Sequence, residues 1–486
     1  MADEPFELSL AAQRALSMEN PRVLAFAGHW RGGQWLSDVA CKFDSHLVGM
    51  AAVGLVARNR PHHVALCIAN IAARRTTSMI YCAQSPAGLA SDIRALQLPV
   101  IVADECDWSD EALCAAREAG TMAISTRDTS ADVAIEVLAD VRGDEGNAGE
   151  SNVALQLLSS GTTGSPKRID LSWSSISSAV ENAGAAYAGS DAAAPQIMVH
   201  PLGNVAGLAY AVPPLVFSRP LVLLDRFTPL GWAEAVRDYR PKRGTVPPVG
   251  IKMVLECEFP DDWLASLDLV AVGGGRVEPE LQEAFERRFG VPVLTAYGAT
   301  EFAGVIANWS LAEYREFGLR KRGSAGRASA GVTIRIVDEG SGHPLAPGKT
   351  GILEAKVARL GDGWVRTTDL ASIDDDGFLF IHGRSDGAIN RGGFKIVPDH
   401  VAGKLRTLEG VSDAAVVGIP DERLGEVPVA VVERERDATL SISGITRRLR
   451  DLLPAYQIPV EIRILDSLPR NASLKISLDE VRKLFG

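Results

Sequence analysis

The chain has 486 residues, of which 46% are hydrophobic, 23% charged and 6% aromatic. This balance is typical of a soluble globular protein and excludes disordered and fibrous classes, while the length predicts more than one domain. The formal net charge is −11, from 50 basic and 61 acidic residues. Because the charge is negative and no long block carries one sign, the composition argues against binding to nucleic acid or to an anionic membrane.

The cysteines include no CxxC pair, which favours buried free thiols over metal ligands or disulfides. They are Cys41, Cys67, Cys82, Cys106, Cys114 and Cys257. The first residues are acidic and lack the basic and then apolar pattern of a signal peptide. The apolar runs are too short, or too interrupted by proline, to cross a bilayer. We therefore expect a cytoplasmic protein without a membrane span.

Apolar runs of strand length alternate with helix-length amphipathic segments in the first part of the chain. Strands are expected at Val64–Ala69, Val100–Ala103, Gln196–Val199, Leu221–Leu224, Leu267–Val272 and Val291–Ala296. Helices are expected at Ser37–Ala57, Ser109–Gly120, Ser172–Gly189 and Pro279–Phe289. The last of these begins with proline and is followed by Gly290, a matched pair of start and stop signals. The alternation predicts parallel sheets covered by helices.

The pattern changes after Gly326 to short strands with Gly and Asp turns, such as Asp375-Asp376-Gly377, which predicts hairpins. A compact segment follows, with expected helices and strands at Pro398–Leu408, Ala414–Ile419, Val427–Glu433, Ile442–Leu452 and Glu461–Leu465. We expect an α/β fold. A large N-terminal domain of packed sheets flanked by helices (residues 1–383) precedes a small, mobile α+β C-terminal domain (residues 384–486).

A loop rich in glycine and hydroxyl groups follows the apolar strand Val153–Leu158. It consists of Ser159, Ser160, Gly161, Thr162, Thr163, Gly164, Ser165, Pro166 and Lys167. Backbone N–H groups and hydroxyls in such a loop can bind phosphate oxygens, and the lysine adds positive charge. The spacing is not that of a P-loop. Taken alone, the segment is equally consistent with a polar surface turn.

A second segment, Thr295-Ala296-Tyr297-Gly298-Ala299-Thr300-Glu301, also follows an expected strand. It brings an aromatic ring, a hydroxyl and a carboxylate to a strand end, where open α/β sheets bind ligands. A tyrosine can stack on a purine, and a single carboxylate suits Mg²⁺. The alternative is an ordinary exit from a strand into a loop.

Two further segments carry a carboxylate and a lysine. In residues 364–370, Asp369 could accept hydrogen bonds from both hydroxyls of a ribose, and Gly383-Arg384-Ser385-Asp386 follows. Near the end of the chain, residues 468–475 end in Lys475. Considered singly, the first is more simply a turn aspartate and the second one solvated lysine among many.

The four segments together, in this order and at these separations, resemble the adenylate-forming superfamily. That superfamily contains acyl- and aryl-CoA synthetases, adenylation domains of peptide synthetases and firefly-type luciferases. The resemblance extends over residues 20–486, nearly the whole chain. Four motifs in register are specific for the superfamily and say little about the substrate.

The resemblance implies roles for the matching positions. Besides the loop 159–167, the ATP- and AMP-binding residues would be Gly273, Gly274, Gly275, Tyr297, Gly298, Thr300, Asp369, Ile381 and Arg384. The catalytic residues would be Lys475, Thr300 and Glu301, the last as the Mg²⁺ ligand. Asp386 would be the hinge, and Gly393 and Lys395 would lie along the pantetheine arm of CoA. The acyl pocket would include Gly203, Asn204, Gly207 and Ala296.

The chain departs from the family pattern at several positions. Four of these differences lie in or next to the motifs, at Arg168, Thr368, Gly387 and Leu474. None of the four differences removes a group with a proposed chemical role. Gly203 and Asn204 stand where the family usually has an aromatic residue and a histidine. Loss of the ring predicts a larger pocket and a bulky, polycyclic or aryl acid, unless another side chain compensates. His200 is expected to be a packed histidine at a strand end.

The resemblance therefore implies ATP-dependent activation of a carboxylic acid to an acyl-adenylate, followed by transfer to CoA. ATP, Mg²⁺ and CoA are the implied cofactors, and a monomer or homodimer is expected. One alternative is a ligase that loads a carrier-protein phosphopantetheine instead of CoA. From another class, the chain could be a non-catalytic nucleotide-binding or regulatory protein. No segment identifies a pocket for an amino acid, which argues against amino-acid adenylation.

Overall fold

The structure is a computed structural model that describes residues 6–82, 84–129, 132–140, 151–158, 168–185, 194–275, 277–385, 387–391, 394–421, 424–471 and 474–486. The chain forms two compact units. The first comprises Met1–Ser160, Pro166–Gly275 and Glu280–Val305, and the second comprises Gly161–Ser165, Arg276–Pro279 and Ile306–Gly486.

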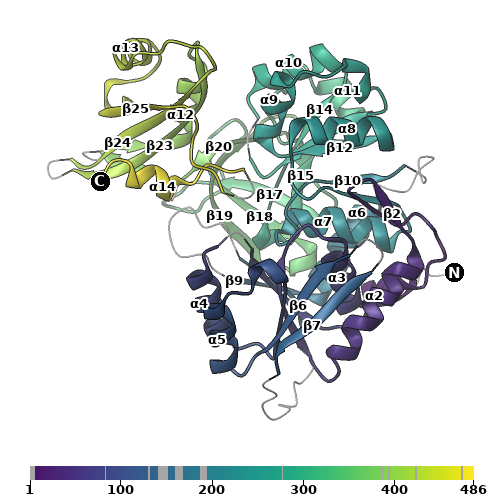
Figure 1. The fold of residues 1–486 in the computed structure, drawn as a ribbon. Coiled ribbons are helices and arrows are strands. Elements are labelled where there is room, and N and C mark those ends of the chain that lie inside the picture. The colour runs from purple at the N-terminus through teal and green to yellow at the C-terminus, as the bar shows by residue number, and fades with distance from the viewer. Residues whose placement is uncertain are drawn as a thin grey trace. The chain divides into compact units, whose positions relative to one another are not determined.

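A seven-stranded sheet is the larger sheet of the first unit (Figure 1), with strand order β7-β6-β5-β3-β4-β8-β9. Its strands are β3 (Ala52–Ala57), β4 (Thr76–Tyr81), β5 (Val100–Asp104), β6 (Met122–Asp128), β7 (Val133–Ala139), β8 (Val153–Leu158) and β9 (Arg168–Ser172). The central pairs are parallel, and β7 and β9 add antiparallel edges. Its helices are α2 (Gly33–His46), α3 (Pro61–Ala72), α4 (Pro86–Leu96), α5 (Asp110–Glu118) and α6 (Trp173–Ala185).

The two faces of this sheet are covered by different helices. On one face, α4 and α5 lie side by side (Figure 1), and their alanines and leucines share a buried core with β3 and β5. On the other, α3 and α6 line a cavity together with β4 and β8. Helices on both faces of a mainly parallel sheet are the arrangement that the sequence predicts, so the expected α/β fold class is confirmed.

The first unit also contains a four-stranded sheet of order β10-β11-β1-β2 and a parallel set β12-β13-β14. The strands are β1 (Leu24–Phe26), β2 (His29–Arg31), β10 (Gln196–Met198), β11 (Leu221–Leu223), β12 (Arg243–Val246), β13 (Leu269–Gly273) and β14 (Val293–Ala299). The helices are α1 (Leu8–Leu16), α7 (Val205–Val216), α8 (Pro229–Tyr239), α9 (Pro248–Glu256) and α10 (Pro279–Phe289). Short 3₁₀ turns occur at η1 (Glu105–Asp107), η2 (Asp261–Leu264) and η3 (Thr300–Phe302).

The second unit begins within β15 (Gly304–Asn308), whose end pairs antiparallel with β16 (Arg327–Ala328). An antiparallel sheet of order β17-β18-β19-β20 follows. Its strands are β17 (Val332–Val337), β18 (Gly351–Val357), β19 (Trp364–Ile373) and β20 (Leu379–Arg384), and the unit also holds α11 (Leu311–Phe317) and η4 (Ala358–Leu360). Gly377, at φ +83°, lies in the β19–β20 turn, which confirms the predicted hairpin.

The last hundred residues form a sheet of order β22-β21-β24-β23, with β25 parallel to β24. The strands are β21 (Ile389–Arg391), β22 (Phe394–Ile396), β23 (Val411–Asp421), β24 (Gly425–Arg434) and β25 (Glu461–Leu465). The helices are α12 (Pro398–Arg406), α13 (Ile442–Leu452), α14 (Leu478–Lys483) and the 3₁₀ turn η5 (Ala455–Gln457). Residues of α12 and α13 join one core and residues of α14 another, so both faces of the sheet are covered.

Two sequence expectations are wrong. Val64–Ala69 is not a strand but the middle of α3, which is buried on every side and so shows no amphipathic period. Residues 37–57 are not one helix, because α2 ends at His46 and β3 begins at Ala52. Gly49, at φ +77°, lies in the break between them.

The cysteine expectation is partly wrong. All six thiols are free, as predicted, but only Cys67 is buried, and Cys41, Cys106 and Cys114 are exposed. No helix among the described residues is both long enough and apolar enough to cross a membrane. The domain boundary expected after residue 383 stays a prediction.

Candidate nucleotide and acyl site

The glycine segment 273–275 begins at the carboxyl end of β13. In the parallel β13–β14 pair, Gly273 lies opposite Ala296, so this segment and the start of the second motif share one edge of the sheet. Gly274 has φ +81°, a left-handed conformation that favours glycine. A Cβ on Gly298 would lie 2.4 Å from the carbonyl oxygen of Gly304, so the backbone there requires a glycine.

The hydroxyl and the carboxylate of the second motif lie on the 3₁₀ turn η3. The turn is anchored by Phe302, which is fully buried, and it closes with a hydrogen bond from Ala303 N to Thr300 O of 2.9 Å. Tyr297 and Thr300 are half-buried, whereas Glu301 is exposed. An exposed carboxylate on an anchored turn fits a Mg²⁺ ion that keeps water and phosphate ligands.

The expected acyl residues lie where the chain enters α7. Asn204 is the residue that precedes the helix, and its carbonyl accepts the first helical bond, from Leu208 N at 3.1 Å. A Cβ on Gly207 would lie 2.1 Å from Pro201 O, so only glycine fits. At Gly203 a Cβ would meet only the Cβ of Ala57, at 3.3 Å. That contact is tighter than ordinary van der Waals packing, so the side chain of Ala57 limits the space at this position.

His200 is packed as predicted. Its Nε2 lies 3.0 Å from Thr245 Oγ1, and its ring stacks on Tyr210 with 5.1 Å between the centroids. The expectation of a packed histidine at a strand end is confirmed.

Asn59, which sequence reasoning missed, holds together the loops beside the acyl position. Its side chain donates to His200 O at 3.1 Å and Leu224 O at 2.9 Å, and accepts from Leu202 N at 2.8 Å. The residue is only 5% exposed, so these backbone groups rely on its amide. Its partners are more than 140 residues away in sequence, so no local signal marks this role.

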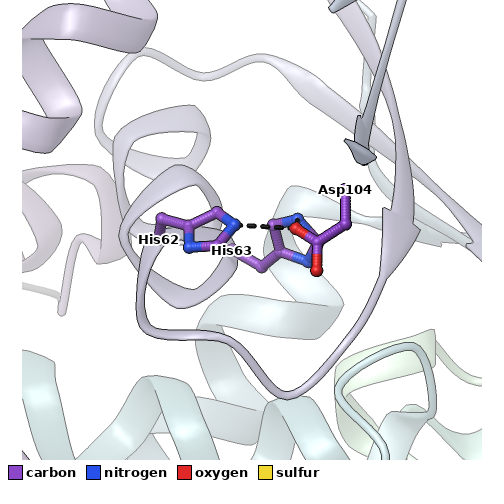
Figure 2. A group of neighbouring side chains, drawn as sticks. All are labelled: His62, His63 and Asp104. Atoms are coloured by element: carbon purple, nitrogen blue, oxygen red, sulfur yellow. Dashed lines mark hydrogen bonds and ion pairs between the residues drawn. The ribbon is translucent and has the colours of Figure 1, made fainter. Parts of the chain in front are cut away.

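A buried polar cluster follows Asn59 at the start of α3 (Figure 2). Asp104 Oδ1 lies 2.9 Å from His62 Nε2 and 3.2 Å from His63 Nε2, and Asp104 also accepts from Thr126 Oγ1 at 3.1 Å. The backbone N–H of Arg58 donates to His63 Nδ1, so the proton of that ring is on Nε2 and points to Asp104. Because a neutral imidazole cannot then offer Nε2 to a metal ion, we interpret the cluster as a hydrogen-bond network.

The charges of this network are set by burial and by the pairing. Burial and the neighbouring His63 lower the pKa of His62 from 6.5 to about 4, although Asp104 opposes the shift. Burial favours the neutral form of Asp104, but hydrogen bonds from His62 and His63 outweigh it and hold the pKa of that carboxyl well below its usual range. The cluster therefore holds one carboxylate and a neutral His62 at neutral pH.

In the second unit, the proposed ribose and nucleotide residues lie on adjacent strands. Asp369 of β19 lies opposite Arg384 of β20, and Ile381 pairs with Ala371. Thr368 Oγ1 accepts a hydrogen bond from Arg384 Nη2 at 2.7 Å. Thr368, which differs from the family pattern, thus orients the guanidinium of Arg384 that is expected to contact the nucleotide.

Lys475 lies in a short hairpin closed by the Arg470–Ile476 bridge. Asn471 makes two hydrogen bonds to Lys475. Its side-chain Oδ1 accepts from the backbone N–H of Lys475 at 3.0 Å, and its own backbone N–H donates to Lys475 O at 2.8 Å. Leu474, where the family has glycine, has φ +60°. Although Lys475 keeps an exposed surface, burial around its ammonium and the charge of Arg384 lower its pKa.

Several expected site residues lie outside the described residues, and their roles stay predictions. They are Ser159, Ser160, Gly161, Thr162, Thr163, Gly164, Lys167, Asp386, Gly393 and the side chain of Lys395. Arg168, next to the phosphate loop, is described, and its Nη1 donates to Met79 O on β4 at 3.1 Å.

Comparison with known proteins decides the family. Residues 42–361 match the AMP-binding enzyme family, and residues 401–475 match the AMP-binding enzyme C-terminal domain. The chain belongs to the AMP-binding enzyme family. The predicted membership in the adenylate-forming superfamily is confirmed.

This AMP-binding enzyme has relatives among CoA ligases. It is 32% identical over 374 residues to indoleacetate–CoA ligase of Aromatoleum aromaticum, covering 72% of each chain. It is 31% identical over 362 residues to 2-succinylbenzoate–CoA ligase of Geobacillus kaustophilus, covering 68% of this chain and 69% of that one. Its fold matches o-succinylbenzoate CoA synthetase of Bacillus subtilis, with TM-score 0.79, 21% identity and 99% coverage of both chains.

Proposed function

We propose that this AMP-binding enzyme activates a carboxylic acid with ATP to an acyl-adenylate and transfers the acyl group to CoA. The observation that carries the proposal is the similarity, at 32% and 31% identity, to two enzymes named as CoA ligases of aryl-containing acids. The described residues Thr300, Glu301, Asp369 and Lys475 supply the groups that this chemistry needs.

In the first step a carboxylate oxygen attacks the α-phosphorus of ATP, and the bond to pyrophosphate breaks. Two anions must approach each other, so positive charge and in-line positioning lower the barrier. Lys475 supplies a cation for the carboxylate and α-phosphate oxygens, and the Thr300 hydroxyl donates to the α-phosphate. Glu301 would hold Mg²⁺, which neutralises charge on the leaving pyrophosphate. Tyr297 stacks on the adenine, and Asp369 accepts from the ribose hydroxyls.

In the second step the CoA thiol attacks the acyl carbonyl of the adenylate. A thioester forms, AMP leaves with the bonding electrons, and the thiol proton passes to solvent. This step does not need Lys475, so a rotation of the small domain about Asp386 can remove the lysine and admit the pantetheine arm beside Gly393 and Lys395. We also propose a cytoplasmic enzyme that is a monomer or a homodimer.

Pyrophosphate release from ATP and Mg²⁺, measured over a broad panel of carboxylic acids with and without CoA, tests the proposal. Release with one acid class and a thioester product in the presence of CoA is the expected result. Release without a thioester would favour a carrier protein as acceptor. ATP binding without release for any acid would favour a non-catalytic nucleotide-binding protein.

A further inference from the structure

An apolar cavity of about 60 Å³ lies within the first unit, between the sheet and the helices α3, α6 and α7. Its walls include the side chains of Met79, Leu155, Trp173, Ile176, Leu208 and Val212. The volume exceeds what one water needs. Since protein interiors are close-packed, space of this size between a sheet and its helices calls for an occupant.

The polar groups of the wall are few and already engaged. Thr77 Oγ1 accepts a hydrogen bond from Asn70 Nδ2 at 3.1 Å. Burial raises the pKa of Cys67 to about 12, so its sulfur remains a neutral thiol. Among the described residues, no charged side chain lines the cavity. A carboxylate placed here would have no partner, whereas an apolar group would lose nothing by leaving water.

Two residues of the cavity wall lie close in sequence to the candidate acyl and phosphate residues. Val205, in its wall, directly follows Asn204 at the start of α7. Ala303, also in its wall, closes the η3 turn by donating its N–H to Thr300 O. An acid whose carboxylate lies beside Thr300 would therefore lie close to the part of the cavity wall that Ala303 forms.

Exposure along α7 shows which end of the cavity is accessible. Ala209 is exposed, whereas Val212 and Pro213, about one turn further along the helix, are buried. The accessible end is thus nearer to the start of the helix, which Asn204 precedes.

We propose that this cavity binds the distal end of the substrate, and that the substrate is a monocarboxylic acid with an extended, uncharged, apolar body. The inference rests on the proposed function for the chemistry at the carboxylate. It excludes two classes of acid: short acids, which cannot reach the cavity, and dicarboxylic acids, which would bury a second charge in it.

The test compares acids and cavity variants in the pyrophosphate-release assay. Unbranched acids of two to ten carbons and ω-phenyl acids are compared with dicarboxylates of equal length. We expect kcat/KM to rise about fourfold for each methylene that enters the cavity. A second carboxylate at the distal end of the acid should lower kcat/KM at least about a hundredfold. Equal kcat/KM along the series, or equal use of dicarboxylates, would overturn the inference.

Ala179→Leu, on α6, fills the cavity from its wall. The ratio of kcat/KM for the longest accepted acid to that for butyrate should fall at least about tenfold. Ala183→Leu lies one turn further along α6 and outside the cavity wall, so the ratio should keep its wild-type value. Thermal unfolding of both variants checks that each is folded. An unchanged ratio in folded Ala179→Leu would also overturn the inference.

Equilibrium dialysis of labelled decanoate, without ATP, separates this inference from the proposed function. Binding that Ala179→Leu weakens at least about tenfold, while no acid releases pyrophosphate, would leave the cavity assignment standing and remove the ligase. The opposite result is pyrophosphate release from acids that bind equally well to wild type and Ala179→Leu. It would support the ligase and overturn the assignment of the cavity.

Discussion

Asn59 Oδ1 accepts the backbone N–H of Leu202 at 2.8 Å, across 143 residues of sequence. The same amide donates to the carbonyl oxygens of His200 and Leu224. One buried side chain thus joins the loop after β3 to the loops after β10 and β11, directly before Gly203 and Asn204. Asn59 therefore helps to position the loop that carries the expected acyl residues Gly203 and Asn204.

Asn59→Ala should therefore affect both stability and catalysis. It leaves three backbone groups without their partner, which we expect to cost about 2–4 kcal/mol of the free energy of unfolding, measured in urea. The KM for the acid should rise more than the KM for ATP, because the displaced loop carries the acyl residues. Asn59→Asp keeps the acceptor for Leu202 N but turns a buried carboxylate toward the two carbonyl oxygens, so it should be at least as damaging as Asn59→Ala. If KM for the acid stayed at its wild-type value in folded Asn59→Ala, the loop would be held by other contacts.

Thr368 and Arg384 allow a matched pair of variants. Thr368 Oγ1 accepts from the Arg384 guanidinium at 2.7 Å, so Thr368→Val removes the acceptor while it keeps the shape. We expect KM for ATP to rise at least about tenfold, the effect of one lost hydrogen bond to a charged group. Thr368→Ser retains the hydroxyl and should stay close to wild type. Equal KM values in the two variants would show that the hydroxyl does not orient Arg384.

Lys475→Ala separates the two half-reactions. Formation of the adenylate should fall at least about a thousandfold, because the cation that bridges the two anions is lost. Thioester formation from a supplied acyl-adenylate and CoA should fall less than about fivefold, since that step needs no lysine. Both rates are measured by product analysis in single turnovers. Equal loss in both would contradict the rotation of the small domain.

The fold could be predicted where its signals are local. α10 and α13 have the bounds that the sequence predicts, because Pro279 and Gly290 mark the ends of α10, Ser441 caps the start of α13, and both helices are amphipathic. β25 is also confirmed at its predicted bounds. Prediction was wrong at α3, where burial on every side leaves an apolar run that fits strand and helix alike. Packing between α3 and its neighbours decides this case, and packing is not visible in a local pattern.

For the candidate site, the sequence identifies residues through motifs but not through contacts. Thr300, Glu301, Asp369 and Lys475 stand out because they lie in motifs that occur together in the order typical of the superfamily. Asn59 does not stand out, since its function exists only through three distant backbone groups. The role of Thr368 is hidden for the same reason, because the Arg384 hydrogen bond depends on strand register.

His62 should make stability depend on pH between about 4 and 6.5. A histidine whose pKa falls from 6.5 to about 4 on folding binds a proton in the unfolded chain before it does so in the folded one. Stability is therefore full above pH 6.5 and is lost as pH falls to about 4, where the folded form also becomes protonated. The difference corresponds to about 3 kcal/mol at most. The pKa of Asp104 is lowered on folding. The stability that this carboxylate contributes therefore decreases only when the pH falls below 3.8, the pKa of the carboxyl group in the unfolded chain.

Urea unfolding of wild type and His62→Gln from pH 4 to 7 measures this effect. The variant cannot take up the proton, so its free energy of unfolding should fall less steeply over this window than that of wild type, by up to about 1.4 kcal/mol per pH unit. His29→Gln removes an exposed histidine from β2 and should follow the wild-type curve. Parallel curves for wild type and His62→Gln would mean that the pKa of His62 does not change on folding. The interpretation of the cluster as a neutral His62 beside a carboxylate would then be wrong.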